Sequence, residues 1–420
     1  MTAGWGWTKL MASVGAKQAI VQGIGFASGI LILRRLPAAD YALYTLAYSM
    51  LGTINVLADG GISSGVMAEA GRVWGDRIRL GRVLATGLAL RRQFAIWSLA
   101  LCVPFLTFLF RQHGASWPTA FALLAAVIVS FWFVLATSVY GVAPALHQRL
   151  TEVQRVTILQ NLGRLGALAG VLLALPSAIA AIGVTAAAQA WAGLRLKRLS
   201  APLADPHQPQ DPAVRAEIQV VVRRMLPSSI YFCLSSQITI WLVGVLGSTT
   251  AVAEVGALGR FGQIFAVLSG FSAVVIIPRF ARLQNDAALI IRRYFQALLV
   301  MGLIGGAIVV LVAIFPREAI WILGAKYRGL TGEVVLQMCG SVLGMLTGIA
   351  YTMGSARKCV ISPKISIPLE VAWQIAWLFL LDLRTVRGVL CYGIATAGLG
   401  VTMHMAYFAI WARRKAGAHP

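Results

Sequence analysis

Apolar segments of about 17–25 residues repeat along this chain, and positive charge gathers in every second gap between them. A helix of that length spans the ~30 Å hydrocarbon core of a bilayer. With the gaps assigned alternately to two sides, 26 of the 36 lysine and arginine residues lie on the side of the N-terminus and 8 on the other. Basic loops favour the cytoplasmic face. The pattern therefore predicts an all-α, multi-pass membrane protein with both termini in the cytoplasm. The twelve predicted spans are 10–33, 41–67, 93–110, 119–140, 156–175, 177–194, 226–247, 253–277, 294–314, 332–353, 366–383 and 387–411.

The composition supports a membrane protein rather than a soluble one. Hydrophobic residues make up 59% of the chain and charged residues only 12%, about half the charged fraction of a soluble domain. In a soluble protein the net charge of +22 would suggest a nucleic-acid partner. Here the topology accounts for the charge, so we expect no nucleic acid. Basic loops instead suit the anionic lipids of the inner leaflet.

The longest polar segment divides the predicted spans six and six. This segment, 195–225, is rich in Pro, Gln and Asp and is predicted to be a flexible cytoplasmic linker. It separates an N-terminal lobe, 1–194, from a C-terminal lobe, 226–420. Two six-helix halves are a common transporter plan. A second basic segment, 72–92, fits either an amphipathic helix on the cytoplasmic surface or a basic loop.

Two arginines fall inside apolar segments, where the preference of basic loops for the cytoplasmic face does not explain them. Arg164 lies near Gln160 and Asn161, and Arg260 lies near Gln263. A bare charge in hydrocarbon costs at least about 2.5–3.5 kcal/mol on insertion scales, so such residues usually face a cavity or a partner. We therefore interpret these five side chains as candidates for binding an anion in a central cavity. The alternative is that each arginine extends to the membrane interface.

A carboxylate and an amide lie one helical turn apart in the second predicted span. Asp59 and Asn55 could bind a proton or a cation that is coupled to transport. Asp59 could equally pair with Arg164, or cap a break at the glycine pair 60–61. The sequence leaves these readings open.

The sequence carries no signature of an enzyme. The five cysteines are scattered and fit small apolar residues better than disulfides or metal ligands. We find no phosphate-binding loop, no nucleophile–base set and no spacing of metal ligands. We therefore expect no catalytic residue, no metal and no cofactor.

Three segments carry a resemblance to a known family. They are "RRLPAADYALYTLAYSMLGTINVLADGGISSGV" at 34–66, "GSTTAVAEVGALGRFGQIFAVLSGFSAVVIIPRFAR" at 247–282 and "ILGAKYRGLTGEVVLQM" at 322–338. Together they are similar, in order and spacing, to the polysaccharide-export flippases of the multidrug/oligosaccharidyl-lipid/polysaccharide exporter superfamily. The segments depart from the family pattern at Ala42, where Gly is frequent, and after Gly256, where an aromatic residue usually follows.

The resemblance implies a V-shaped transporter of twelve helices in two lobes, in a bacterial inner membrane. It would move a polyprenyl-pyrophosphate-linked oligosaccharide from the cytoplasmic to the outer leaflet by alternating access, for surface polysaccharide biosynthesis. A monomer is expected, with a polysaccharide polymerase and glycosyltransferases as candidate partners. The family's cavity is cationic, and Arg164 and Arg260 are the candidates here by composition and depth. Neither matches a motif position of the family.

Three other readings remain. A drug/cation antiporter of the same superfamily would use Asp59 for coupling. A major-facilitator transporter would carry Gly-x-x-x-Asp-Arg before its third span. Here Asp76-Arg77 is present, but Arg72 stands where Gly is needed. A membrane scaffold or glycosyltransferase is disfavoured, because an outer domain and paired catalytic carboxylates are missing.

Overall fold

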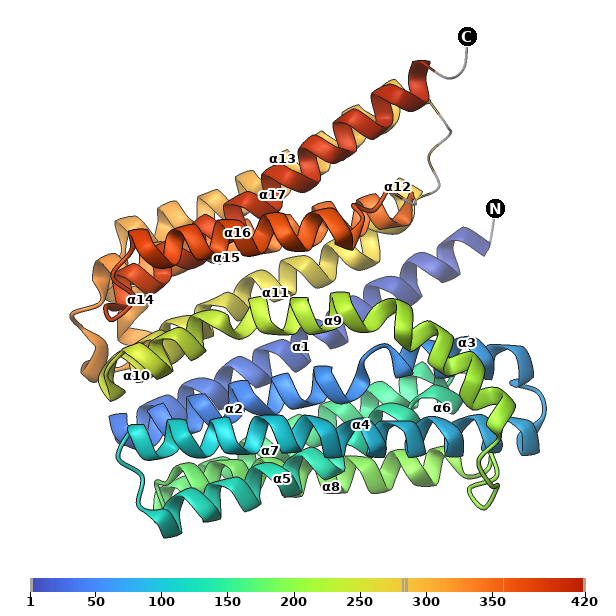
Figure 1. The fold of residues 1–420 in the computed structure, drawn as a ribbon, viewed down its shortest axis with the longest axis horizontal. Helices are drawn as coiled ribbons and strands as arrows, with labels where there is room; N and C mark the ends of the chain where they lie inside the picture. The colour runs from blue at the N-terminus through green and yellow to red at the C-terminus, as the bar shows by residue number, and fades with distance from the viewer. Residues whose placement is uncertain (1–2, 282, 284–285, 358, 418–420) are drawn as a thin grey trace. The chain divides into compact units, whose positions relative to one another are not determined.

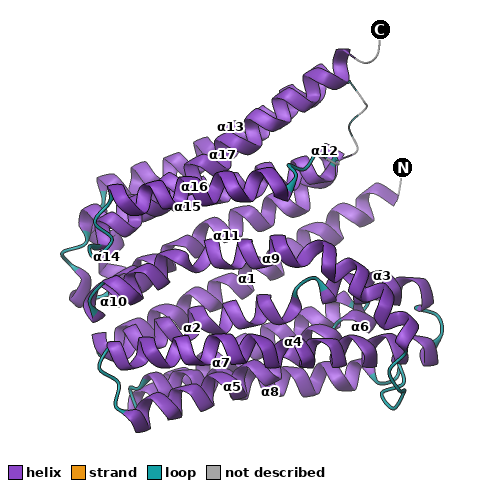
Figure 2. Cartoon of the chain, in the orientation of Figure 1, coloured by secondary structure: helices purple, strands orange, loops and turns teal. Residues whose placement is uncertain are grey.

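The computed structural model describes residues 3–281, 283, 286–357 and 359–417. Within these ranges the regular elements are all helical and no strand occurs, as Figure 1 and Figure 2 show. The α-helices are α1 (Ala3–Arg35), α2 (Ala38–Asp59), α3 (Ile62–Val73), α4 (Arg77–Gln112), α5 (Trp117–Tyr140), α6 (Val142–Leu146), α7 (Leu150–Ala174), α8 (Ala178–Ser200), α9 (Pro212–Leu246), α10 (Thr249–Leu258), α11 (Gly262–Phe271), α12 (Ile277–Ala281), α13 (Ala287–Ile314), α14 (Pro316–Leu323), α15 (Thr331–Ala356), α16 (Pro363–Leu380) and α17 (Val386–Gly417). Two 3-10 turns, η1 (Gly259–Phe261) and η3 (Ala325–Tyr327), and a π-helical turn, η2 (Ser272–Ile276), lie between them.

Nine helical stretches of the described chain are long and apolar enough to cross a membrane. They fall on nine of the twelve predicted spans. The other three predictions, 10–33, 41–67 and 366–383, fall on α1, α2 with α3, and α16. The prediction of an all-α, multi-pass membrane protein is therefore confirmed.

Two predictions about local structure were wrong. The span predicted at 41–67 is not one helix, because α2 ends at Asp59 and α3 begins at Ile62. The basic segment 72–92 is neither a separate surface helix nor a loop. From Arg77 onward it is continuous with α4, a helix of 36 residues. This helix begins there because the side chain of Asp76 accepts hydrogen bonds from the backbone N–H groups of Ile78 and Arg79 at 2.9 and 3.0 Å.

Internal contacts divide the chain into two compact units, residues 27–253 and residues 1–26 with 254–420. In the unit 27–253, α2 packs against α4, α5, α8 and α9, while α5 and α7 pack against α8. Buried side chains of α3 and α4 form one of its apolar clusters, together with Ile218 and Val222 of α9. Gly87 permits this close packing, because a Cβ there would lie 2.3 Å from the side chain of Val66.

In the other unit, α15 is the central helix and packs against α11, α13, α14 and α17. Helix α16 packs on α17. An aromatic cluster joins α13 to α17, where the rings of Tyr294 and Phe408 stack at 3.8 Å with an interplanar angle of 10°. Burial of such large rings is a major source of stability for the helix pair.

The segment predicted as a linker, 195–225, is largely helical. Helix α8 continues to Ser200 and α9 begins at Pro212, which leaves residues 201–211 between them. Asp211 caps α9 by accepting a hydrogen bond from the backbone N–H of Ala213 at 2.9 Å. The division into lobes at 1–194 and 226–420 stays a prediction.

Candidate functional site

A break in the helical backbone separates α2 from α3. Gly60 and Gly61 have φ angles of 48° and 95°, a region that side-chain-bearing residues rarely adopt. Asp59 is the last residue of α2, and its carboxylate accepts hydrogen bonds from the backbone N–H of Ser63, at 3.2 Å, and from the Ser63 hydroxyl. The first N–H groups of a helix have no partner within it. Asp59 therefore caps the break, as one of the sequence readings allowed.

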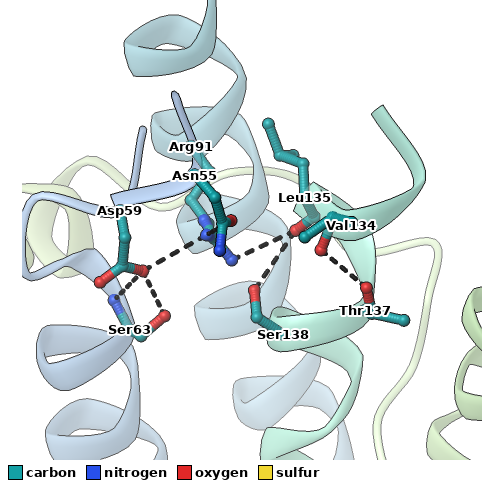
Figure 3. Close-up of polar contacts among 8 residues, drawn as sticks. All are labelled: Asn55, Asp59, Ser63, Arg91, Val134, Leu135, Thr137 and Ser138. Carbon is teal, nitrogen blue, oxygen red and sulfur yellow. Dashed lines mark hydrogen bonds and ion pairs between the residues drawn. The ribbon is translucent and has the colours of Figure 1, made fainter. Parts of the chain in front are cut away.

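The ion-pair partner of Asp59 is Arg91 of α4, as Figure 3 shows. Its Nη2 lies 3.5 Å from Oδ1 of Asp59 and donates a hydrogen bond of 3.2 Å to Oδ1 of Asn55. Its Nη1 donates to the backbone oxygen of Leu135 in α5 at 3.3 Å. A buried charge is tolerated when it is paired and hydrogen-bonded. The cluster Asn55–Asp59–Arg91 thus joins α2, α4 and α5.

The two charged side chains of this cluster differ in exposure. The Arg91 side chain is 2% exposed, while that of Asp59 is 28% exposed. The guanidinium is therefore enclosed by protein, whereas the carboxylate remains open to small ions or water. The cluster therefore keeps the Asp59 carboxylate partly exposed while the buried Arg91 guanidinium balances its charge.

Helix α9 passes the same break. A Cβ added to Gly60 would lie 2.8 Å from Cδ1 of Leu226, and one added to Gly61 would lie 2.8 Å from Cβ of Met225. The next residue of α9, Pro227, lies inside the helix. It removes a backbone hydrogen bond there and favours a bend. Two adjacent helices therefore have weakened backbones at the same level, and Figure 1 shows α9 changing direction along its length.

The predicted anion-binding residues of the first half lie on α7. Asn161 donates a hydrogen bond from its side chain to the backbone oxygen of Thr157 at 2.8 Å. Gln160 and Arg164 are half-buried. The Nε of Arg164 is buried without a hydrogen-bond partner among the described residues. No ion pair joins Arg164 to Asp59 in the described part of the chain, so that sequence reading is wrong: Asp59 pairs with Arg91.

The predicted residues of the second half lie where the helix geometry changes. Arg260 is in the 3-10 turn η1 and is buried, at 9% exposure. The Oε1 of Gln263, at the start of α11, is buried without a hydrogen-bond partner among the described residues. Both η1 and α11 pack against α15, where Gln337 donates a hydrogen bond to the Ser341 hydroxyl at 3.1 Å. Ser341 lies close to the start of α11, because a Cβ added to Gly262 would lie 3.5 Å from its Oγ.

The predicted residues thus form three groups, one at the α2–α3 break, one on α7 and one at η1 and α11. The residue that sequence reasoning missed is Arg91, which was counted with the basic residues of 72–92. A signal was present, because "VLATGLALRR" at 83–92 is apolar up to Arg91 and continues in a helical pattern into the third span. In the described residues no cluster of three or more His, Cys, Asp or Glu side chains could hold a metal ion.

No protein-family model matches the chain, and no curated protein matches it by sequence. Solved structures match it by fold. One is the inward-facing conformation of a multidrug resistance MATE family transporter of the MOP superfamily, with a TM-score of 0.69 and 14% identity over 96% of this chain and 99% of that chain. An outward-facing conformation of such a transporter has a TM-score of 0.58 and 15% identity, over 98% and 95% of the two chains. A crystal structure of MATE in complex with MaD3S has a TM-score of 0.60 and 16% identity, over 98% and 96%. The chain therefore has a MATE-like fold.

Proposed function

We propose that this protein is an alternating-access transporter that flips a lipid-linked oligosaccharide, held through a polyprenyl pyrophosphate, from the cytoplasmic to the outer leaflet. The observation that carries the proposal is Arg164, a cation within an apolar span whose Nε is buried without a partner in the described chain. The fold, similar along its length to transporters in inward- and outward-facing conformations, supports the transport step.

The chemistry of Arg164 favours an anionic substrate. Charges buried in a protein are usually paired, and Arg91 with Asp59 follows that rule. Arg164 has no such carboxylate among the described residues. A pyrophosphate would supply it, because guanidinium binds phosphate through paired, charge-assisted hydrogen bonds. Gln160 and Asn161 offer further donors on the same helix.

Arg260 and Gln263 would be the matching group in the other unit. Arg260 is buried, and Gln263, three residues further along the chain, has an amide oxygen without a hydrogen-bond partner in the described chain. An amide that accepts no hydrogen bond in this state can accept one from a sugar hydroxyl. A polar head with both phosphate and hydroxyl groups therefore fits this pair of side chains.

The α2–α3 break and Pro227 of α9 would absorb the change of shape that alternating access requires. Hinges lie at a few residues that tolerate large changes of φ and ψ. Asp59 lies at this break, so a proton or cation that binds its exposed carboxylate would compete with Arg91 and change the local packing. In this way coupling-ion binding at Asp59 and Asn55 would bias the hinge.

A drug/cation antiporter is the second candidate, and one observation favours it: structures of multidrug resistance MATE transporters match this fold. The two functions differ in the charge of the substrate. An antiporter for cationic drugs would have little use for Arg164 and would depend on Asp59.

The test uses a bacterial strain that lacks this protein and is complemented with single variants. Arg164→Ala and Arg260→Ala should each abolish surface polysaccharide display at normal membrane abundance. Arg317→Ala, which removes an exposed arginine of α14, is the matched control and should display normally. In vesicles, the wild type should move a fluorescent polyprenyl-pyrophosphate sugar between leaflets. Normal display in both the Arg164 and Arg260 variants would contradict the flippase. Loss of drug export in Asp59→Asn, with display intact in both arginine variants, would favour the antiporter.

A further inference from the structure

A cavity of about 590 Å³ lies in the unit 27–253, outside the three groups described above. Its walls are one face of α4, the ends of α5 and α8, and the segment 201–210. On α4 the lining residues recur every three or four positions, from Gly81 to Arg92, so they form a single stripe. In Figure 1 the loop that joins α8 to α9 lies at the same end of this unit as the start of α4.

The loop segment that forms one wall of this cavity is held against α4 by hydrogen bonds. The backbone N–H of Asp205 donates to the backbone oxygen of Arg77 at 3.1 Å. That of Asp211 donates to the hydroxyl of Thr86 at 2.9 Å. The loop also touches the α4 backbone directly, because a Cβ on Gly81 would lie 2.3 Å from the oxygen of Asp205. The wall is therefore a built feature of the fold.

The lining combines apolar side chains with cationic ones. Leu84 and Leu88 supply apolar surface, while Arg92 and Lys197 are exposed side chains that reach the cavity from α4 and α8. The guanidinium of Arg92 lies over the ring of Trp132 at 5.8 Å, which limits its freedom. A cavity of this size is typical of ligand sites. A ligand with a negative group and an apolar body would satisfy both parts.

Asp205 is a carboxylate that lines the cavity, but both of its oxygens accept hydrogen bonds from the loop itself. Oδ2 of Asp205 accepts a hydrogen bond of 2.6 Å from the Gln208 side chain, and Oδ1 accepts one of 3.1 Å from the backbone of His207. The hydrogen bond from Gln208 and then that from His207 lower the pKa of this carboxyl below its usual range. Arg77 and Arg82 lie beside the same loop, bonded to Ala201 and Gln208. The surroundings therefore remain positive.

The charge distribution predicts that this end of the unit faces the cytoplasm, where anionic glycerophospholipids carry the negative charge of the leaflet. We propose that the cavity binds the phosphate headgroup of an anionic glycerophospholipid, with Arg92 and Lys197 on the phosphate and Leu84 and Leu88 against the start of an acyl chain. Such a lipid is a resident ligand and not the transported one. The inference therefore does not depend on the proposed function.

The test uses the full-length protein in phosphatidylcholine vesicles that contain a small fraction of photoactivatable phosphatidylglycerol. Crosslinks should map to residues 84–92 and 197–210. At about 1 kcal/mol for each basic side chain near the surface, Arg92→Gln and Lys197→Gln should each weaken labelling about fivefold, and the double variant about 30-fold. Arg317→Gln is the control and should label like the wild type.

A second variant removes space and leaves the charge unchanged. Ala85→Phe places a ring in the cavity from the α4 stripe and should also suppress labelling, with folding checked by gel filtration. Equal labelling of the wild type and the double variant would overturn the proposal. So would equal labelling by photoactivatable phosphatidylcholine. Loss of labelling when inorganic phosphate is added at millimolar concentration would show a site for soluble anions and would also contradict it.

Discussion

The pairing of Arg91 with Asp59 can be measured with a double-mutant cycle of Arg91→Met, Asp59→Asn and both together. Asp59→Asn leaves a guanidinium of 2% exposure with only neutral partners, Asn55 and the Leu135 oxygen. Removing one member of a buried pair costs about 3–5 kcal/mol. We expect about 3 kcal/mol, the lower end, because Asp59 is 28% exposed and solvent already screens its charge.

Replacing Arg91 should lower the free energy of unfolding by less than replacing Asp59. Arg91→Met leaves Asp59 hydrogen-bonded to Ser63 and in contact with solvent, so about 1–2 kcal/mol is expected for the lost hydrogen bonds. The double variant leaves no unpaired charge and should cost only about 2 kcal/mol. The resulting coupling energy of about 2–3 kcal/mol is typical of residues in contact.

The free energy of unfolding can be followed by tryptophan fluorescence as the protein is moved from a mild detergent into a denaturing one. Arg92→Met, at the exposed neighbouring position, is the matched control and should cost below about 1 kcal/mol, the worth of an exposed cation–π contact. Strict additivity of the two single changes would refute the reasoning, because it would mean that the two charges do not interact.

Three further predictions concern the α2–α3 break and the loop. Gly61→Ala should lower the free energy of unfolding by at least about 1–2 kcal/mol, because φ is 95° and the new methyl group would contact Met225. The control is Gly71→Ala, in open space on helix α3, which should raise the free energy of unfolding by about 0.5–1 kcal/mol. Acid should loosen the segment 201–211. Hydrogen bonds lower the pKa of Asp205. The carboxylate therefore stabilises the loop fully above the usual aspartate pKa of about 3.9, and this stabilisation is lost as pH falls through the lowered value. Asp205→Asn should increase protease cleavage of the segment at neutral pH to the same extent, and unchanged cleavage would contradict the role of the carboxylate. A reporter fused at Gln208 should be cytoplasmic, and an external signal would overturn the topology.

The sequence carried enough information for the spans but not for their local ends. Apolar length and alternating charge are properties of whole segments, so they locate helices such as α5 and α13 well. The break after Asp59 depends on which glycines adopt positive φ, and the α9 side chains that pack against Gly60 and Gly61 come from far along the chain. Sequence periodicity does not record such contacts.

The same limit explains why Arg91 was missed. The bias of basic residues toward the cytoplasmic face assigns each loop to one side of the membrane and predicts nothing about the burial of a single arginine. Arg91 is buried because the partners Asn55, Asp59 and Leu135 come from two other helices. Arg164 and Arg260 were found because their apolar neighbours are adjacent in sequence. Their role in binding a substrate stays a prediction.

The length of α4 sets the depth of the buried pair. At a rise of about 1.5 Å per residue, its 36 residues extend about 54 Å, while about 20 residues cross the hydrocarbon. The helix ends at Gln112, before a short turn to α5, so the overhang lies at its other end. If the hydrocarbon begins at Gln112, counting back about 20 residues places its opposite boundary beside Arg91. Arg164 lies ten residues before Ala174, the end of α7, or about 15 Å, close to the midplane. A membrane potential acts on a charge in proportion to the fraction of the field it crosses. Voltage therefore does little work on the Arg91–Asp59 pair and far more on any displacement of Arg164.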